Sequence, residues 1–287
     1  FEGLSEEAYP TPEDLAKDVV RVLREEIADL IKGGPDFIQL DEPVLTEEAR
    51  RLGFSNERGV ENKIRLLKNI SGLWLVQQCR RDLADHGESY DYCQLTQLAQ
   101  TSPSMRTLID PAHEPFAAPG AMLAKIEVFA KTTDQPVPET PGQFVRCCLE
   151  SLALLYRDTL DQLENVLGKR FERLHIVGGG GRNGLLNQMT ADATGRHVWV
   201  GPYEATIIGN ALTQAMGRGD VEDLAHLRRI VRASVELIHY EPCGAADFDA
   251  QARRLRYRVV TTARARIDWE SCSKVFIMKK DSPKKSL

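Results

Sequence analysis

The chain lacks the features of a membrane or secreted protein. Its 287 residues contain no apolar run long enough to cross a bilayer and no secretory signal pattern. The six cysteines and six histidines are scattered, without the spacing of a disulfide framework or of a metal site. These absences favour a reducing, cytoplasmic location, and they predict neither a membrane partner nor a metal ligand set.

Acidic residues outnumber basic ones except at the C-terminal end. The net charge is −5, yet residues 251–287 hold 11 Lys or Arg against 3 Asp or Glu. Such a tail can bind nucleic acid or an anionic membrane, but it is more often solvated and poorly ordered. The second interpretation is favoured for residues 246–287, so no nucleic-acid partner is predicted.

The most informative segment is LHIVGGGGRNGLLNQMTADATG, from Leu174 to Gly195, which predicts a strand, a glycine turn and a helix. Glycines 178–181 can adopt positive φ and let the backbone approach a flat or anionic ligand. The helix that begins near Asn183 directs free N–H groups into the same turn. This pattern indicates a nucleotide site, and the alternative is a tight turn that contacts no ligand.

Two kinds of nucleotide site compete for these glycines. Gly179, Gly181 and Gly184 fit G-x-G-x-x-G, and Glu204 follows about 20 residues later, where a dinucleotide fold places a ribose-binding acid. Such a motif normally opens its domain, whereas this one lies past the middle of the chain. An NAD-dependent oxidoreductase is therefore the weaker alternative, and the absence of Gly-Lys-Ser/Thr excludes a Walker loop.

Two helices flank the glycine segment in the sequence. The residues TPGQ (140–143) predict a capped start for the first helix, and Gly168 predicts its end. We expect this helix to pack against the glycine strand and to bury Cys147 and Cys148. The second helix is predicted from Glu204 to Met216, and Gly209 within it predicts close packing against a sheet. Its predicted inner face consists of Ala205, Ile208, Ala211, Leu212 and Ala215.

Three ordered blocks carry a resemblance to a known family. They are Ile64–Arg81, Pro136–Glu164, and Leu174–Gly195 followed by Val200–Gly219. From about Glu42 to Pro242 the chain resembles the C-terminal half of the FGGY carbohydrate kinases, and among them the rhamnulokinases. The resemblance implies an α/β, ribonuclease-H-like domain of the actin and hexokinase type over residues 42–245. It also implies ATP, Mg²⁺ and a small sugar as ligands.

The same resemblance implies roles for individual residues. Gly179 matches the principal ATP contact, with Gly178 and Gly180 beside it, and a side chain at Gly179 would collide with the base. Gln77 matches a nucleotide-contacting glutamine, and Asn69 matches the sugar-binding asparagine. Their spacing of eight residues predicts that both lie on one face of a helix starting near Ile70.

Two further asparagines follow the glycine turn. Asn183 and Asn187 lie one helical turn apart, so we expect both side chains to face the same side, where they could form hydrogen bonds near the nucleotide. For Asn183 an equally good interpretation is helix capping, because asparagine is a favoured N-cap residue.

Residues 1–41 resemble a different family. A predicted helix followed by the strand DFIQLDEP, from Asp36, is similar to part of the barrel of cobalamin-independent methionine synthases. One helix and one strand cannot close a barrel of eight such units, so methyl transfer is not expected. We interpret residues 1–41 as an extra helix–strand unit before the kinase-like domain.

Several parts that an FGGY kinase needs are missing from this sequence. The general-base aspartate and the phosphate-binding turns have no counterpart, so no catalytic residue is assigned. The resemblance implies phosphorylation of L-rhamnulose by ATP, but we expect negligible turnover by the chain without the N-terminal kinase half. A non-catalytic nucleotide-binding remnant is the alternative. The first strands of the domain are also missing, which leaves a sheet edge that residues 37–40 could fill.

Overall fold

The computed structural model describes residues 47–59, 64–244, 248 and 250. By its contacts the chain divides into one unit of residues 1–45 with 56–65 and another of residues 46–55 with 66–287. The helix–strand unit predicted for residues 1–41, the strand 37–40 and the tail 251–287 lie outside the described residues. The domain bounds 42–245 and 246–287 therefore stay predictions.

The first described elements are a short helix and a small two-stranded sheet. Helix α2 (Glu47–Arg51) precedes the strands β1 (Ser55–Arg58) and β2 (Ile64–Leu67), which pair as a two-stranded sheet. An ion pair between the side chains of Glu57 and Arg65 joins the two strands.

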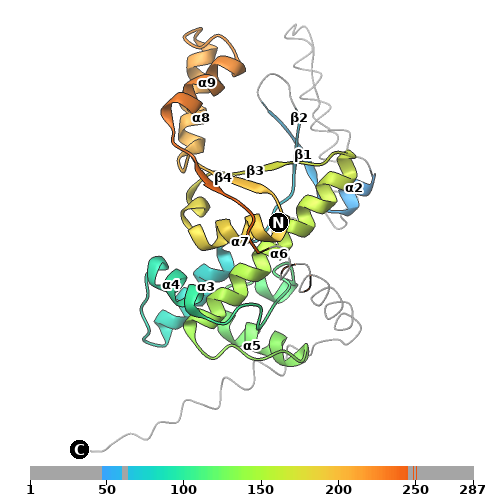
Figure 1. The fold of residues 1–287 in the computed structure, drawn as a ribbon, viewed down its shortest axis with the longest axis vertical. Coiled ribbons are helices and arrows are strands. Elements are labelled where there is room, and N and C mark those ends of the chain that lie inside the picture. Colours follow the sequence, from blue (N-terminus) through green and yellow to red (C-terminus); the bar gives the residue numbers. More distant parts are fainter. Residues whose placement is uncertain (1–46, 60–63, 245–247, 249, 251–287) are drawn as a thin grey trace, which may run out of the picture. The chain divides into compact units, whose positions relative to one another are not determined.

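A helical layer forms the larger hydrophobic core (Figure 1). Its elements are α3 (Trp74–Asp85), α4 (Tyr92–Thr101), η2 (Glu114–Phe116), α5 (Met122–Thr132) and α6 (Pro141–Leu167). Helix α6 packs mainly against α4 and against α7 (Gly184–Thr194). Cys147 and Cys148 are buried in this core, which confirms their prediction as small apolar residues.

Both ends of α6 follow the sequence signals. The Thr140 side chain accepts a hydrogen bond from the Gln143 N–H at 3.4 Å, with proline in the first helical position. Gly168 ends the helix with φ of 59°, a left-handed conformation that glycine adopts without a Cβ penalty. The Gln143 side chain accepts instead from the N–H of Glu139, one residue before the cap.

Gly142 allows α4 and α6 to approach closely. A Cβ at this position would lie 2.4 Å from the Leu98 carbonyl oxygen and 2.6 Å from the Ser102 hydroxyl. We predict that Gly142→Ala lowers the free energy of unfolding by about 1–3 kcal/mol, because the backbone of α4 must move away. Urea unfolding of the variant and of Gly217→Ala, where a Cβ meets nothing within 4 Å, tests this. Equal losses in the two variants would contradict it.

The glycine segment forms the predicted strand, turn and helix. Strand β3 (Arg173–Ile176) leads through η3 (Gly179–Arg182) into α7, and β4 (His197–Val200) then pairs in parallel with β3. Strand β5 (Ile238–Tyr240) pairs antiparallel with the other edge of β4. Among the described strands β3 has β4 as its sole neighbour, so its second edge is open.

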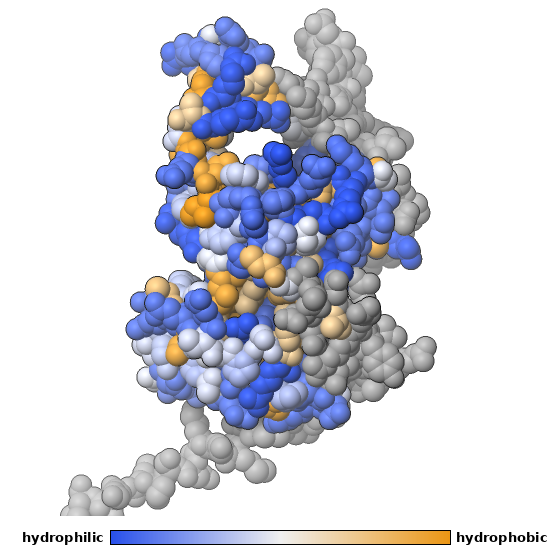
Figure 2. All heavy atoms as spheres, in the orientation of Figure 1, coloured by the Kyte–Doolittle hydropathy of each residue, from blue (hydrophilic) through white to orange (hydrophobic). Residues whose placement is uncertain are grey.

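Helix α8 (Ala205–Gly217) forms where the sequence predicts it but does not bury its apolar face. No residue of α8 is buried, and the helix packs mainly against α9 (Leu224–Ser234). The prediction of close packing at Gly209 is wrong for the part of the chain that the structure describes, since a Cβ there would meet none of its atoms within 4 Å. The apolar face stays unburied, although Ile208 lines a pocket together with Val200 of β4 and Ile238 of β5. Figure 2 shows hydrophobic side chains on the surface over this helix.

Candidate nucleotide site

Two of the four glycines in the turn are required by the fold itself. Gly178 alone in the run has positive φ, at 83°, and its N–H donates to the carbonyl oxygen of Pro202 at 3.1 Å. Gly181 is buried, and a Cβ there would lie 2.7 Å from Cγ1 of Val200. These glycines set the path of the turn and its packing on the sheet.

The other two glycines are exposed and have open space above them. Among the described residues, a Cβ at Gly179 would meet no atom within 4 Å, and a Cβ at Gly180 would meet only the Leu73 side chain, at 3.9 Å. Neither residue has positive φ. Packing and backbone conformation therefore do not require glycine at Gly179, whereas a flat ligand resting on the turn would.

A cleft of about 660 Å³ opens beside this turn, along the open edge of β3. Its walls are the start of α3, the second half of α6, β3 and the first turns of α7. Helix α6 and β3 both line this cleft, and the expectation that β3 packs against α6 stays a prediction. The lining residues are Ile70, Gly72, Leu73, Gln77, Tyr156, Thr159, Leu160, Leu163, Leu174, His175, Ile176, Val177, Gly180, Leu186, Asn187 and Thr190.

The cleft brings together Gln77, Gly180 and Asn187 of the predicted site residues. Asn69 is exposed one residue before the lining residue Ile70. The prediction that Asn69 shares a helix with Gln77 is wrong: α3 begins at Trp74, and residues 68–71 lie in the connection before it. Gly178, Gly179 and Asn183 do not line the cleft, although Gly178 and Gly179 directly precede Gly180.

Asn183 and Asn187 hold the turn in place from within the protein. The Asn183 side chain caps α7 by accepting from the Leu186 N–H at 2.9 Å. Asn187 is buried, and its Nδ2 donates to the Gly181 carbonyl oxygen at 2.8 Å. The capping interpretation of Asn183 is thus confirmed, and both side chains support the glycine turn.

Helix α6 contributes polar groups that the sequence analysis did not select. The Thr159 hydroxyl is buried and has no hydrogen-bond partner among the described residues, and Thr159 lines the cleft. Burial raises the pKa of the nearby Tyr156, so its hydroxyl stays protonated at neutral pH. Both side chains can donate to a bound molecule. The helical period of α6 could have placed Tyr156, Thr159 and Leu163 on one face, but only the tertiary structure brings that face to β3.

The acid required by the dinucleotide interpretation lies elsewhere. Glu204 is exposed, pairs with Arg182 at 3.7 Å and does not line the glycine cleft. It lines instead a smaller pocket of about 250 Å³ with Tyr203 and Ile208. A ribose bound at the glycine turn would therefore not have this carboxylate among the residues lining its cleft.

Among the helices within residues 47–59 and 64–244, none is both long enough and apolar enough to cross a bilayer.

Comparison with known proteins is consistent with this geometry. The profile of the "FGGY family of carbohydrate kinases, C-terminal domain" matches residues 36–218. A rhamnulokinase from Bacteroides thetaiotaomicron is 46% identical over 213 residues, which cover 74% of this chain and 43% of that protein. A rhamnulokinase from Yersinia pestis is 39% identical over 208 residues, covering 72% of this chain and 42% of that protein. The chain thus spans less than half of these relatives.

Solved structures show the same fold. A ligand-bound xylulose kinase and a gluconate kinase, both from Lactobacillus acidophilus, superpose with TM-scores of 0.55 and 0.54. Each is 15% identical, and the match covers 79% of this chain and 45% of the solved chain. At this identity the likeness concerns the fold alone, and it confirms the predicted ribonuclease-H-like α/β architecture.

Proposed function

Because the chain belongs to the FGGY family of carbohydrate kinases, whose C-terminal domain it matches over residues 36–218, we propose that it forms the nucleotide-binding half of a sugar kinase. The parent reaction we propose is transfer of the γ-phosphoryl group of ATP to L-rhamnulose. The observation that carries the choice of sugar is the 46% identity to a rhamnulokinase over 213 residues.

The glycine turn is the proposed site of the adenosine. The open space above Gly179 and the exposed Gly180 would accept the flat base and the ribose without displacing protein atoms. Gln77, exposed in the first turn of α3, would donate to or accept from the nucleotide across the cleft. The unpartnered Thr159 hydroxyl adds a further donor. Asn69, next to this cleft in the chain, is the proposed sugar contact.

The residues that line the cleft do not fit a magnesium site. Mg²⁺ prefers carboxylate, phosphate and water oxygens, and no carboxylate is among the lining residues. In an ATP complex the metal would have to be bound by the phosphates and by groups outside this lining. We therefore assign no magnesium ligand and no metal-dependent step to the described residues.

Phosphoryl transfer also needs a base to accept the proton of the sugar hydroxyl. Among the described residues that line the cleft, only His175 could act as such a base. His175 lies on β3 beside the glycine turn, and not in the segment that carries the proposed sugar contact Asn69. The chain by itself is therefore proposed to bind ATP with negligible turnover.

A nucleotide-binding remnant without catalysis is the second candidate, and the same absence of a cleft carboxylate favours it. The cytoplasmic location stays a prediction.

Calorimetric titration of the purified chain with ATP and with NAD tests the nucleotide assignment. We expect saturable binding of ATP and none of NAD, because Glu204 lies outside the glycine cleft. A folded chain, judged by circular dichroism, that bound NAD but not ATP would refute the proposal. A coupled L-rhamnulose phosphorylation assay on the same sample is expected to show no turnover above background. Turnover would show that this chain supplies a base that we have not identified.

A further inference from the structure

Three polar side chains lie together on one exposed face of the β3–β4–β5 sheet, away from the glycine turn. Trp199 of β4 pairs in register with His239 of β5, and His197 lies two residues before Trp199. Side chains alternate between the two faces of a strand, so His197, Trp199, His239 and Glu241 share one face. His197, His239 and Glu241 are exposed, so ions in solution can reach them.

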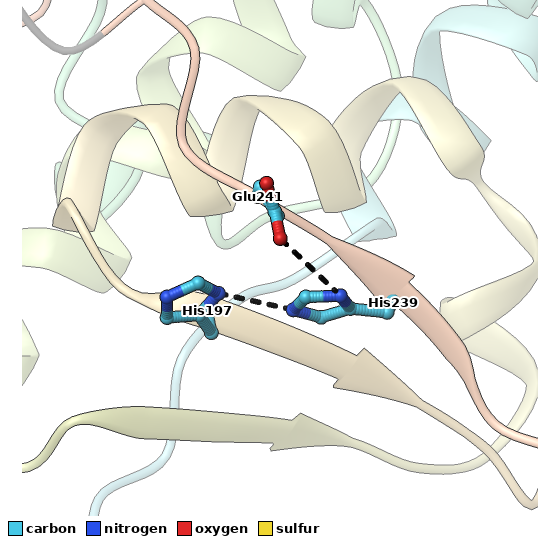
Figure 3. A group of neighbouring side chains, drawn as sticks. All are labelled: His197, His239 and Glu241. Carbon is cyan, nitrogen blue, oxygen red and sulfur yellow. Dashed lines mark hydrogen bonds and ion pairs between the residues drawn. The ribbon is translucent and has the colours of Figure 1, made fainter.

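The two imidazoles point toward each other. Nδ1 of His197 and Nε2 of His239 are 3.0 Å apart, and the Oε1 atom of Glu241 lies 3.9 Å from Nδ1 of His239 (Figure 3). One ligand atom from each of the three side chains lies within 4.8 Å of the others. No sequence pattern indicates this group, because 42 residues separate the two histidines and only the strand pairing joins them.

The neighbouring tryptophan restrains this arrangement. The Trp199 ring stacks on the His239 ring with a centroid distance of 4.2 Å and an interplanar angle of 16°. This contact limits rotation of the His239 ring and keeps its Nε2 directed toward His197. The cluster is therefore partly ordered for a ligand before one binds, which lowers the entropic cost of binding.

We propose that His197, His239 and Glu241 bind a first-row divalent transition metal ion, with Zn²⁺ as the best match. Two neutral imidazoles and a carboxylate are a common zinc ligand set, and a water molecule would complete a tetrahedron. Two Zn–N bonds at a tetrahedral angle hold their nitrogens about 3.3 Å apart, close to the 3.0 Å seen here. Magnesium is disfavoured because it prefers an all-oxygen shell.

The bound ion would join the last strand to the rest of the sheet. Strand β5 has three residues and pairs only with β4 among the described strands. A metal that is bound by His197 on β4 and by His239 on β5 adds a link between these strands beside their backbone hydrogen bonds. This inference is independent of the kinase proposal, since none of the three ligands lines the glycine cleft.

Zinc titration of the whole chain, purified without a polyhistidine tag and after removal of metal, tests the site. The exposed thiols of Cys93 and Cys243 also bind zinc, so every protein should carry Cys93→Ser and Cys243→Ser. We expect one saturable site in calorimetry. We expect His197→Ala and His239→Ala each to weaken it about 10-fold or more, and Glu241→Gln to weaken it less.

His175→Ala is the matched control, because His175 is an exposed histidine on the adjacent strand β3, paired with Trp199 and outside the cluster. It should leave zinc affinity unchanged. Cobalt(II) should give the visible spectrum of a nitrogen and oxygen site in the starting protein and lose it in His239→Ala. Circular dichroism checks that each variant is folded. Absence of a saturable site, or equal zinc affinity of folded His197→Ala and His175→Ala, would overturn the proposal.

Discussion

Gly179→Val is expected to abolish measurable ATP binding while leaving the folded structure and its unfolding midpoint unchanged. The valine side chain would project into the open space above the turn, where no atom of the described residues lies within 4 Å of a Cβ. The fold therefore tolerates it, whereas a nucleotide base resting on the turn would collide with it. We expect ATP affinity to fall about 100-fold or more, equivalent to about 2.7 kcal/mol of binding free energy.

Gly181→Ala is the matched control, because at Gly181 the fold itself excludes a side chain. Its Cβ would lie 2.7 Å from Cγ1 of Val200, so the added methyl group must displace the sheet or the turn. We expect a loss of about 1–3 kcal/mol in the free energy of unfolding, measured by urea titration. Unchanged ATP affinity in a folded Gly179→Val protein would refute the adenosine assignment. An unchanged stability of Gly181→Ala would refute the view that this glycine supports the turn.

Arg196→Ala is expected to cause the largest loss of stability among the proposed substitutions. One guanidinium nitrogen lies 3.1 Å from both carboxylate oxygens of Glu164, and the others donate to the carbonyl oxygens of Phe171 and Thr194. The Arg196 and Glu164 side chains are only 11% and 15% exposed. Their interaction joins the end of α6 to both ends of the β3–α7 segment. Removing one partner leaves a nearly buried carboxylate, which costs about 3–5 kcal/mol.

The exposed pair of Arg106 and Glu139 is the control for this prediction. Its side chains are 31% and 68% exposed, and the ion pair has a similar distance of 3.0 Å. Arg106→Ala should cost at most about 1 kcal/mol, because water screens an exposed pair. Urea unfolding of the two variants gives the comparison. Similar losses would show that burial does not strengthen the Arg196 interaction.

The ion pair between Arg196 and Glu164 also predicts how the stability of the protein depends on pH. Burial alone would raise the pKa of Glu164, but the hydrogen bond from the Phe171 N–H and the contact with Arg196 lower this pKa below its ordinary value. The pKa of an unfolded glutamate is about 4.3. The stabilisation is therefore complete above that pH and is lost as the pH falls through the lower folded pKa. We expect the stability gap between the native chain and Arg196→Ala to narrow on acidification, and a constant gap would contradict this cause.

Local sequence signals correctly predicted the position of most helices and strands for which such signals were present. Thr140 and Gly168 marked the ends of α6 because a capping hydroxyl and a left-handed glycine satisfy backbone groups within a few residues. The glycine run marked the β3–α7 connection for the same local reason. Asn69 was the exception: the predicted start of its helix near Ile70 was too early, and the structure begins α3 at Trp74.

The sequence by itself thus determined the family, the ribonuclease-H-like architecture and the glycine turn, since each depends on residues that are close together in the chain or on ordered blocks of them. The tertiary structure decided what lies against each surface. Periodicity showed that α8 has an apolar face, but it could not show that this face stays unburied. Likewise, Thr159 joined the cleft and His197 met His239 only through packing and strand pairing, because contacts between distant segments leave no local pattern in the chain.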